Sequence, residues 1–370
     1  MTISEVITKK ELHQFIRFPY KLYRNDSNWV HPLIIEREEF FNPQKNPFYE
    51  HGEVKLFLAL DSNNKPIGRI SAHLNFNHNN FYKDKIGFFG FFECVENYDA
   101  AEQLFTAASL WLKSKGMEAM RGPMDFSTNE ECGLLIKGFG EPPVLMMAYN
   151  PAYYIDFFER FGLVKAMDMI AYFFPYKEVP PYITKAAERI LKRNNNIVIR
   201  VINRKRFWDE IEIFKKIYNS AWESNWGFVP LTDKEIVKMS KDFKMIMDND
   251  LVMIAEVDGK PAGFSLILPD YNMVLKKMNG RLFPFGVFKL LLGKKKIDMV
   301  RVLTMGVIEE YRNLGIDILF YYYSFINAIK RGYSKAEFSW ILEDNTMMNR
   351  ILLRMGADPY KTYRIYDKKL

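Results

Sequence analysis

Residues 305–317 read MGVIEEYRNLGID, and this stretch decides the fold of the second half of the chain. It follows an apolar run at 300–305 that is typical of a buried strand, which Gly306 and Val307 close, and it precedes a long apolar run at 318–330 that is typical of a helix. A turn that contains glycine and an arginine, between a strand and a helix start, presents backbone N–H groups and the positive end of the helix dipole. The stretch is therefore predicted to hold a phosphate.

The elements around this turn are expected in a definite order. Before it, strands at 252–257 and 262–268 are joined by Asp258 and Gly259, a dipeptide that favours a hairpin. After it come a helix at 313–330, a strand at 335–341, a polar turn at 343–345, a helix at 346–355 and a closing strand at 362–367. The pattern indicates an α/β fold with a mixed sheet.

In the turn and in this order of elements, the sequence resembles the GNAT acyltransferase superfamily. Gly306, Val307, Arg312 and Gly315 carry the resemblance. It implies that the turn's amides hold the pyrophosphate of acyl-CoA or acetyl-CoA, the co-substrate, and that the strand edge pairs with the pantetheine arm. The binding residues it implies are Met305, Gly306, Val307, Arg312, Asn313, Leu314, Gly315, Ile316, Asp317 and Asn345. No metal is expected.

Asp317 departs from the superfamily pattern, which prefers glycine or alanine there. Its carboxylate either points inward and repels the pyrophosphate, or points outward and caps the helix.

The first half of the chain repeats the plan of the second. Strands are expected at 54–60, 67–74 and 86–92, followed by a helix at 100–115. The run 59–68 parallels 255–263, and 158–163 parallels 352–357; chance similarity of hairpin and helix-end signals is the alternative. The prediction is two GNAT-like domains, at 1–176 and 197–370, with a helical junction at 177–196.

The first domain is expected to be a degenerate copy. Where the phosphate turn should be, residues 93–99 contain Glu93, Glu96 and Asp99 and no glycine, which argues against coenzyme binding. This domain is then structural or shapes the substrate site. The polar run at 121–131 either lines an acceptor site or forms a solvated loop.

Residues 271–297 form an insertion between two strands that are neighbours in a minimal GNAT domain. Residues 271–296 contain seven basic and no acidic side chains, and without them the chain has 45 basic and 45 acidic residues. Large apolar side chains alternate with these cations, which is typical of a segment that binds an anionic membrane surface. A lid over the coenzyme, a site for single-stranded nucleic acid and a plain surface loop remain alternatives.

The remaining features of the sequence indicate where in the cell the protein is expected. The chain has two cysteines, Cys94 and Cys132, no apolar signal-peptide core at its start, and no apolar run near the roughly 20 residues that a spanning helix needs. A cytoplasmic protein is expected, either free or peripheral on the inner face of the membrane. A nucleic acid partner is not expected.

The resemblance implies an N-acyltransferase that moves an acyl group from acyl-CoA to an amine, and the insertion suggests a long-chain or lipidic amine. Deprotonating the amine requires a base, for which Glu337, Glu343 and Asp344 are the candidates. Backbone N–H groups at 304–307 would polarise the thioester carbonyl. A Fem-type aminoacyl transferase and a non-catalytic, membrane-associated acyl-CoA-binding protein are the alternatives.

Overall fold

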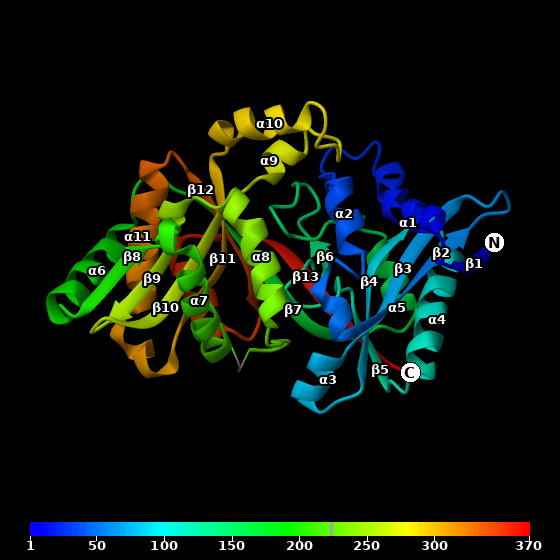
Figure 1. Ribbon diagram of the computed structural model, residues 1–370, viewed down its shortest axis with the longest axis horizontal. Helices are drawn as coiled ribbons and strands as arrows, with labels where there is room; N and C mark the ends of the chain where they lie inside the picture. Colours follow the sequence, from blue (N-terminus) through cyan, green and yellow to red (C-terminus); the bar gives the residue numbers. More distant parts are fainter. Residues whose placement is uncertain (223–224) are drawn as a thin grey trace. The chain divides into compact units, whose positions relative to one another are not determined.

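The computed structural model describes residues 1–222 and 225–370, and the chain divides into two units (Figure 1). Unit 1 comprises Met1–Ile170, Asn272–Gly293 and Lys361–Leu370, and unit 2 comprises Ala171–Tyr271 and Lys294–Tyr360. Each unit contains a mixed sheet with helices on both faces.

The sheet of unit 1 has the order β1-β2-β3-β4-β5-β13, with β6 pairing to β13 as a side branch. Strands β4 and β5 run parallel, and the other neighbours run antiparallel. The strands are β1 (Thr2–Glu5), β2 (Gly52–Leu60), β3 (Pro66–Asn75), β4 (Ile86–Cys94), β5 (Ala119–Gly122), β6 (Leu134–Lys137) and β13 (Asp358–Lys369).

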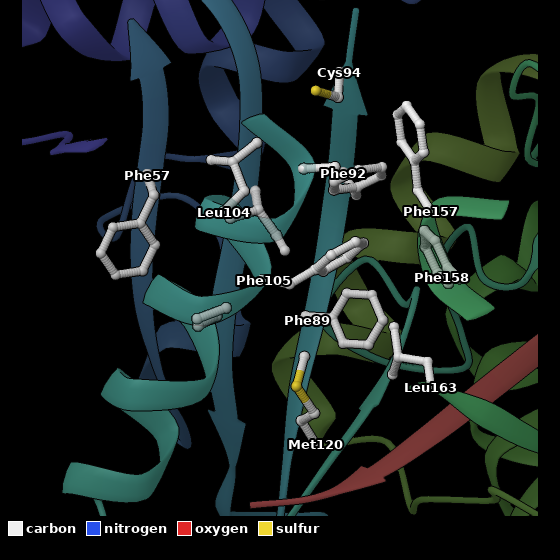
Figure 2. Close-up of a cluster of buried hydrophobic side chains, with 14 of the residues drawn as sticks. Phe57, Phe89, Phe92, Cys94, Leu104, Phe105, Met120, Phe157, Phe158 and Leu163 are labelled. Atoms are coloured by element: carbon white, nitrogen blue, oxygen red, sulfur yellow. The ribbon is translucent and has the colours of Figure 1, made fainter. Parts of the chain in front are cut away.

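Helices cover both faces of this sheet. On one face, α4 (Tyr98–Ser114) and α5 (Tyr154–Arg160) pack on the strands through a buried cluster that includes Phe89, Phe105 and Phe158 (Figure 2). On the other face, α1 (Lys9–Leu22) and α2 (Ile34–Phe40) enclose a second cluster rich in phenylalanine. A short helix, α3 (Phe76–Tyr82), follows β3. Burying apolar side chains on both faces stabilises the sheet as a central layer.

The sheet of unit 2 has the order β8-β9-β10-β11-β12, in which β11 and β12 run parallel and the others antiparallel. One face carries α6 and α11, and the other carries α7, whose Phe214 ring lies 4.7 Å from that of Phe264 on β10. The elements are α6 (Pro181–Arg193), β8 (Ile197–Val201), α7 (Phe207–Ala221), α8 (Asp233–Ile246), β9 (Val252–Val257), β10 (Lys260–Pro269), β11 (Met299–Val307), α11 (Ile316–Lys330), β12 (Lys335–Leu342) and α12 (Thr346–Met355).

The two units therefore share one plan: antiparallel strands that lead into a parallel pair, with a helix connecting the pair. This confirms the predicted α/β class and the repeat of a GNAT-like fold. The strands predicted from alternating hydrophobicity and hairpin signals begin and end within a few residues of β2, β3, β4, β9, β10, β11 and β12.

The division by contacts differs from the predicted domain boundaries at residues 171–196, all of which belong to unit 2, and in two further places. Residues 361–370 belong to unit 1, because β13 pairs with β5 from Tyr366 opposite Gly122 onward and also pairs with β6. Two strands, β7 (Val164–Pro175) and β13, therefore begin in one unit and end in the other.

The second of these further places is the insertion, most of which belongs to unit 1. It contains α9 (Asn272–Leu275) and α10 (Gly286–Gly293). The Ile34 N–H donates to the Gly280 carbonyl at 3.0 Å, and the Asn272 side chain donates to the Pro143 carbonyl at 2.9 Å. These hydrogen bonds anchor the insertion beside α2.

Candidate functional site

The second half of β11 exposes one edge of its backbone. The strand pairs with β10 up to Val307, but its parallel pairing with β12 stops at Val302 opposite Phe338. Beyond that point no register pair joins β11 and β12 in the described part of the chain. The edge from Leu303 to Val307 can therefore form strand-like hydrogen bonds with an extended ligand.

A β-bulge lies at the start of this edge. Leu266 is opposite Thr304 and Ile267 is opposite Val302, so Leu303 is an extra residue. Residues directly opposite each other on paired strands lie on the same face of the sheet. Arg301 therefore lies on the same face as Leu268, and Thr304 lies on the same face as Leu266. Because Leu266 and Leu268 share a face, the bulge brings Arg301 and Thr304 to the same face, the one covered by α7.

The turn after β11 leads directly into a helix. A 3-10 helix, η5 (Glu309–Leu314), is followed by Gly315, whose φ of +76° lies in the left-handed region that favours glycine. A Cβ on Gly315 would also lie 2.6 Å from the Ile190 side chain of α6. The helix α11 then starts at Ile316, and its first N–H groups have no partner within the helix.

Asp317 lies in the first turn of α11 and is half-buried. Burial raises the pKa of its carboxyl, while the backbone N–H groups of Ile318 and of Asp317 itself donate to it and lower that pKa. The residue at the helix cap is Gly315, and no side chain there makes a capping hydrogen bond. The half-buried carboxylate of Asp317 lies in the turn at which the resemblance places a pyrophosphate.

The other residues of the predicted coenzyme set contribute mainly their backbone. Ile316 is buried in the core of unit 2, and Met305, Val307 and Leu314 pack against that core. Arg312 and Asn313 are exposed. At Ile316, Met305, Val307 and Leu314, only the backbone groups are therefore available to a ligand.

Arg312 bridges two elements. Its Nε donates to the Val307 carbonyl at 3.4 Å, and its terminal nitrogen donates to the Ala221 carbonyl at 3.3 Å. The guanidinium therefore joins the end of β11 to the end of α7.

Asn345 acts as a helix cap, since its side chain accepts a hydrogen bond from the Met348 N–H at 3.2 Å. A neighbour that the sequence did not indicate, Asn349, donates to the Leu342 carbonyl at 3.0 Å and accepts from the Tyr172 hydroxyl at 2.9 Å. These contacts fix the end of β12 against α12.

Among the three base candidates, Glu337 is the buried one. It is fully buried on β12, and its register partner on β11 is Arg301, so both lie on the face covered by α7. The Tyr360 hydroxyl donates to Oε2 of Glu337. Glu343 and Asp344 are exposed in the turn that follows β12.

Further polar groups on the same face were not predicted. Arg301 is 3% exposed and donates to the hydroxyl of Ser339 at 2.9 Å and to its carbonyl at 3.2 Å. Oε1 of Glu337 and the hydroxyl of Thr304 are buried, and neither has a hydrogen-bond partner among the described residues. A buried polar atom without a partner costs about 1–3 kcal/mol, so both atoms are suited to contact a ligand.

The corresponding strands of unit 1 also separate. The parallel pairing of β4 and β5 covers only Ile86 to Phe88, opposite Ala119 to Arg121. A register shift in β3 opposite β4, between Arg69 and Ser71, marks a bulge like that in unit 2.

Residues 123–132 fill this separation in unit 1. The Met124 N–H donates to the Phe89 carbonyl at 2.8 Å, and the Phe91 N–H donates to the Asp125 carboxylate at 2.9 Å. Burial, together with the negative charge of Glu131, raises the pKa of Asp125 to about 7. The polar run after β5 therefore packs on its own sheet and is not a solvated loop, because Met124 and Phe126 are buried.

The prediction that residues 93–99 form an acidic turn is wrong for Glu93, because β4 continues to Cys94. Glu93 is buried and accepts hydrogen bonds from the hydroxyls of Tyr23 at 2.5 Å and Tyr154 at 2.9 Å. Burial raises its pKa to about 7, against the opposing effect of Arg69. At the start of α4, the Asn97 side chain accepts from the Ala100 N–H at 3.1 Å.

The insertion displays an apolar surface. Five large side chains on α10 and the loop before it are 63–72% exposed: Phe283, Phe285, Phe288, Leu291 and Leu292. Lys289 is exposed among them, and Lys294, Lys295 and Lys296, which follow α10 directly, are exposed as well. We call Phe283–Lys296 the basic apolar tip.

Residues 1–222 and 225–370 lack two further kinds of feature. No helix there combines the length and the apolar character needed to cross a membrane. No three histidine, cysteine or acidic side chains gather there in a way that would hold a metal ion.

Comparison with known proteins gives two full-length relatives, although no protein-family model matches the chain. It is 37% identical to Protein YghO of Escherichia coli (strain K12), over all of this chain and 95% of that protein. It is 35% identical to the bacterial ceramide synthase of Caulobacter vibrioides (strain NA1000 / CB15N), over all of this chain and 98% of that protein.

Solved structures confirm the fold. A tandem GNAT protein from the clavulanic acid biosynthesis pathway matches with a TM-score of 0.58 at 8% identity, over 100% of this chain and 98% of that one. A GCN5-related N-acetyltransferase from Sphaerobacter thermophilus matches with a TM-score of 0.55 at 11% identity, over 100% and 95%. The predicted resemblance to tandem GNAT proteins is therefore confirmed.

Proposed function

The chain belongs to the same family as Protein YghO and the bacterial ceramide synthase, and from this premise we propose that it transfers an acyl group from acyl-CoA to a primary amine. The observation that carries the proposal is the unpaired edge of β11, from Leu303 to Val307, which ends at the helix start Gly315. Beside that edge, the same face carries the buried carboxylate of Glu337.

In the proposed complex, the pantetheine arm extends along the edge of β11 as an additional strand. The pyrophosphate lies at the start of α11, where the remaining first-turn N–H groups and the helix dipole favour an anion. The thioester carbonyl accepts a hydrogen bond from a backbone N–H next to the bulge, which stabilises the oxyanion that forms on attack.

The reaction follows from these positions. Glu337 takes a proton from the ammonium of the acceptor, directly or through water, and the neutral amine attacks the thioester carbon. A C–N bond forms, the nitrogen loses its second proton, the C–S bond breaks, and the thiolate of coenzyme A leaves and takes up that proton. Tyr360 positions Glu337 through its hydrogen bond to Oε2, which leaves Oε1 to accept the proton.

We further propose that the acceptor is a long-chain amine at a membrane surface. The name of the Caulobacter relative, a ceramide synthase, supports an amide-forming reaction on a lipid. The basic apolar tip supports the location, because exposed phenylalanine and leucine side chains insert between headgroups and each nearby cation adds about 1 kcal/mol of attraction to anionic lipid. A cytoplasmic protein, peripheral on the inner leaflet, would meet such substrates.

Activity is tested by incubating the full chain with acetyl-, octanoyl- or palmitoyl-CoA and a long-chain amino alcohol, and measuring free thiol and amide product. We expect thiol release matched by amide, fastest with the long acyl chains. Coenzyme binding without product would favour a non-catalytic acyl-CoA-binding protein, and absence of binding at every chain length would refute the proposal. Turnover of aminoacyl-tRNA instead would favour the Fem-type alternative.

The membrane role is tested by replacing Lys294, Lys295 and Lys296 with Glu and measuring sedimentation with vesicles of phosphatidylglycerol and phosphatidylcholine. We expect binding to weaken at least tenfold, since the triple variant reverses three of the tip's charges. The matched control replaces the exposed Lys9, Lys10 and Lys113 with Glu, the same change in net charge elsewhere, and should bind as the wild type does. Equal losses in both variants would contradict a specific role of the tip.

A further inference from the structure

An indole ring lies against the backbone of the proposed coenzyme edge. A Cβ on Gly306 would fall 2.1 Å from the Trp222 ring, and the three atoms nearest to that position all belong to its six-membered part. Trp222 therefore rests on Gly306 at contact distance, and the absence of a side chain at residue 306 makes this possible.

The ring lies on the reacting face of β11. Gly306 is opposite Phe264, which shares a face of β10 with Leu266 and Leu268. That face carries Thr304 and Arg301, and the adjacent strand contributes Glu337 to it. Gly306 is two residues from Thr304, on the side toward the helix start at Gly315. The ring therefore lies between the proposed thioester position and the proposed pyrophosphate position.

Trp222 is held in place by an aromatic row on α7. Its ring stacks on Tyr218 with 5.0 Å between the ring centres and 25° between the planes, and the Tyr218 ring lies 5.4 Å from that of Phe214 and 5.6 Å from that of Phe228. Residues 214, 218 and 222 are spaced four apart, so they lie along one face at the end of the helix. The hydrogen bond from Arg312 to Ala221 fixes the same helix end to β11.

We propose that Trp222 is a positioning residue that packs against the pantetheine arm and holds it on the edge of β11. This inference rests on the proposed function. The arm has apolar segments between its amides, and a flat ring beside the strand edge buries them while leaving those amides free to pair with the backbone. Because the arm is the same in every acyl-CoA, the contact contributes equally for all acyl chains.

The test measures the binding of coenzyme A itself to the full chain by calorimetry, and then kcat and KM with acetyl- and palmitoyl-CoA. In Trp222→Ala we expect coenzyme affinity to fall about tenfold and KM to rise by the same factor for both acyl-CoAs, with kcat nearly unchanged. Trp222→Phe should restore part of the affinity. Gly306→Ala, whose methyl displaces the ring, should resemble Trp222→Ala.

The matched control is Trp208→Ala, on the same helix but 45% exposed, which should bind coenzyme A as the wild type does. Wild-type affinity in Trp222→Ala would overturn the inference, and so would a loss confined to palmitoyl-CoA, which would place the ring on the acyl chain. A wild-type chain that binds no coenzyme A would instead refute the proposed function on which the inference rests.

Discussion

The parallel strand pairs of the two units begin alike and end differently. In unit 1, β4 and β5 separate after Phe88, and in unit 2, β11 and β12 separate after Val302, each next to a bulge. In unit 1, residues 123–132 then enter the gap, and Asp125 accepts the hydrogen bond of the Phe91 N–H. The backbone plan alone therefore does not make a coenzyme site, since a short loop occupies the edge in one copy.

The buried polar groups beside the two strand edges also differ in whether they have hydrogen-bond partners. Glu93 in unit 1 accepts hydrogen bonds from two tyrosines. In unit 2, Oε1 of Glu337 and the hydroxyl of Thr304 have no hydrogen-bond partners in the part of the chain that the structure describes. Beside its strand edge, unit 1 pairs the buried carboxylates of Glu93 and Asp125 internally, whereas unit 2 retains Oε1 of Glu337 and the Thr304 hydroxyl, which a substrate can satisfy.

The largest expected effect is on kcat, and it distinguishes the buried Glu337 of unit 2 from the buried Glu93 of unit 1. Glu337→Gln keeps the size of the side chain and an acceptor for Tyr360 but cannot take a proton, so we expect kcat to fall about 10²–10³-fold. The control, Glu93→Gln, should remain within about twofold of wild type, because unit 1 takes no part in the proposed chemistry. Steady-state thiol release measures both, and equal losses would contradict the division of roles.

A smaller expected effect is the change in the stability of unit 1 as the pH rises. The pKa of Glu93 and that of Asp125 are each raised to about 7 from ordinary values near 4, so the folded chain holds these protons more tightly than the unfolded chain. The stability they contribute is present below pH 4 and is lost between pH 4 and 7, by at most about 1.4 kcal/mol per pH unit for each group.

The double variant Glu93→Gln and Asp125→Asn should remove this loss. Urea unfolding at pH 5 and pH 8 measures it, and the wild type should lose more stability between the two than the variant does. The same pH dependence in both proteins would mean that these carboxyl groups do not carry raised pKa values.

The smallest expected effect is on KM, and it is measured by comparing two glycines at opposite ends of α11. Gly315 and Gly332 both have left-handed backbone, with φ of +76° and +87°, so alanine costs about 1 kcal/mol of stability at either position. Only Gly315 opens the proposed phosphate site. We expect KM for acyl-CoA to rise about fivefold in Gly315→Ala, where the methyl also meets Ile190, and to stay unchanged in Gly332→Ala.

Thermal unfolding and steady-state kinetics on both variants check this pair. A rise in KM in Gly332→Ala of the same size would show that the effect arises from weakened folding and not from the turn.

Much of the fold was accessible from the sequence because its signals are local. Alternating apolar residues, the hairpin at Asp258 and Gly259, and the turn ending at Gly315 each act over a few residues, and they predicted the central strands of both units and the helices after β4 and β11. They did not predict β1, α1 or α2. The placement of residues 361–370 in unit 1 was not accessible, since it depends on pairing between Tyr366 and Gly122, far apart in the chain.

Part of the site could also be predicted, because its signals in the sequence are local. The turn and Glu337 follow from the order of elements, and the structure adds that Glu337 is buried while Glu343 and Asp344 are exposed. The roles of Arg301, Thr304 and Trp222 depend on which face each side chain takes. For Arg301 and Thr304, that face is set by the bulge at Leu303, which leaves no signal in the sequence. Trp222 follows α7, and its contact with Gly306 joins segments far apart in the chain.

The central claim, that the strand edge of unit 2 is a coenzyme site and that of unit 1 is closed, is tested most directly by hydrogen exchange with and without coenzyme A. Bound coenzyme should slow exchange of the backbone N–H groups at 303–317 and leave those at 89–97 unchanged, with one molecule bound per chain. Slower exchange at 89–97, or a second bound molecule, would contradict it.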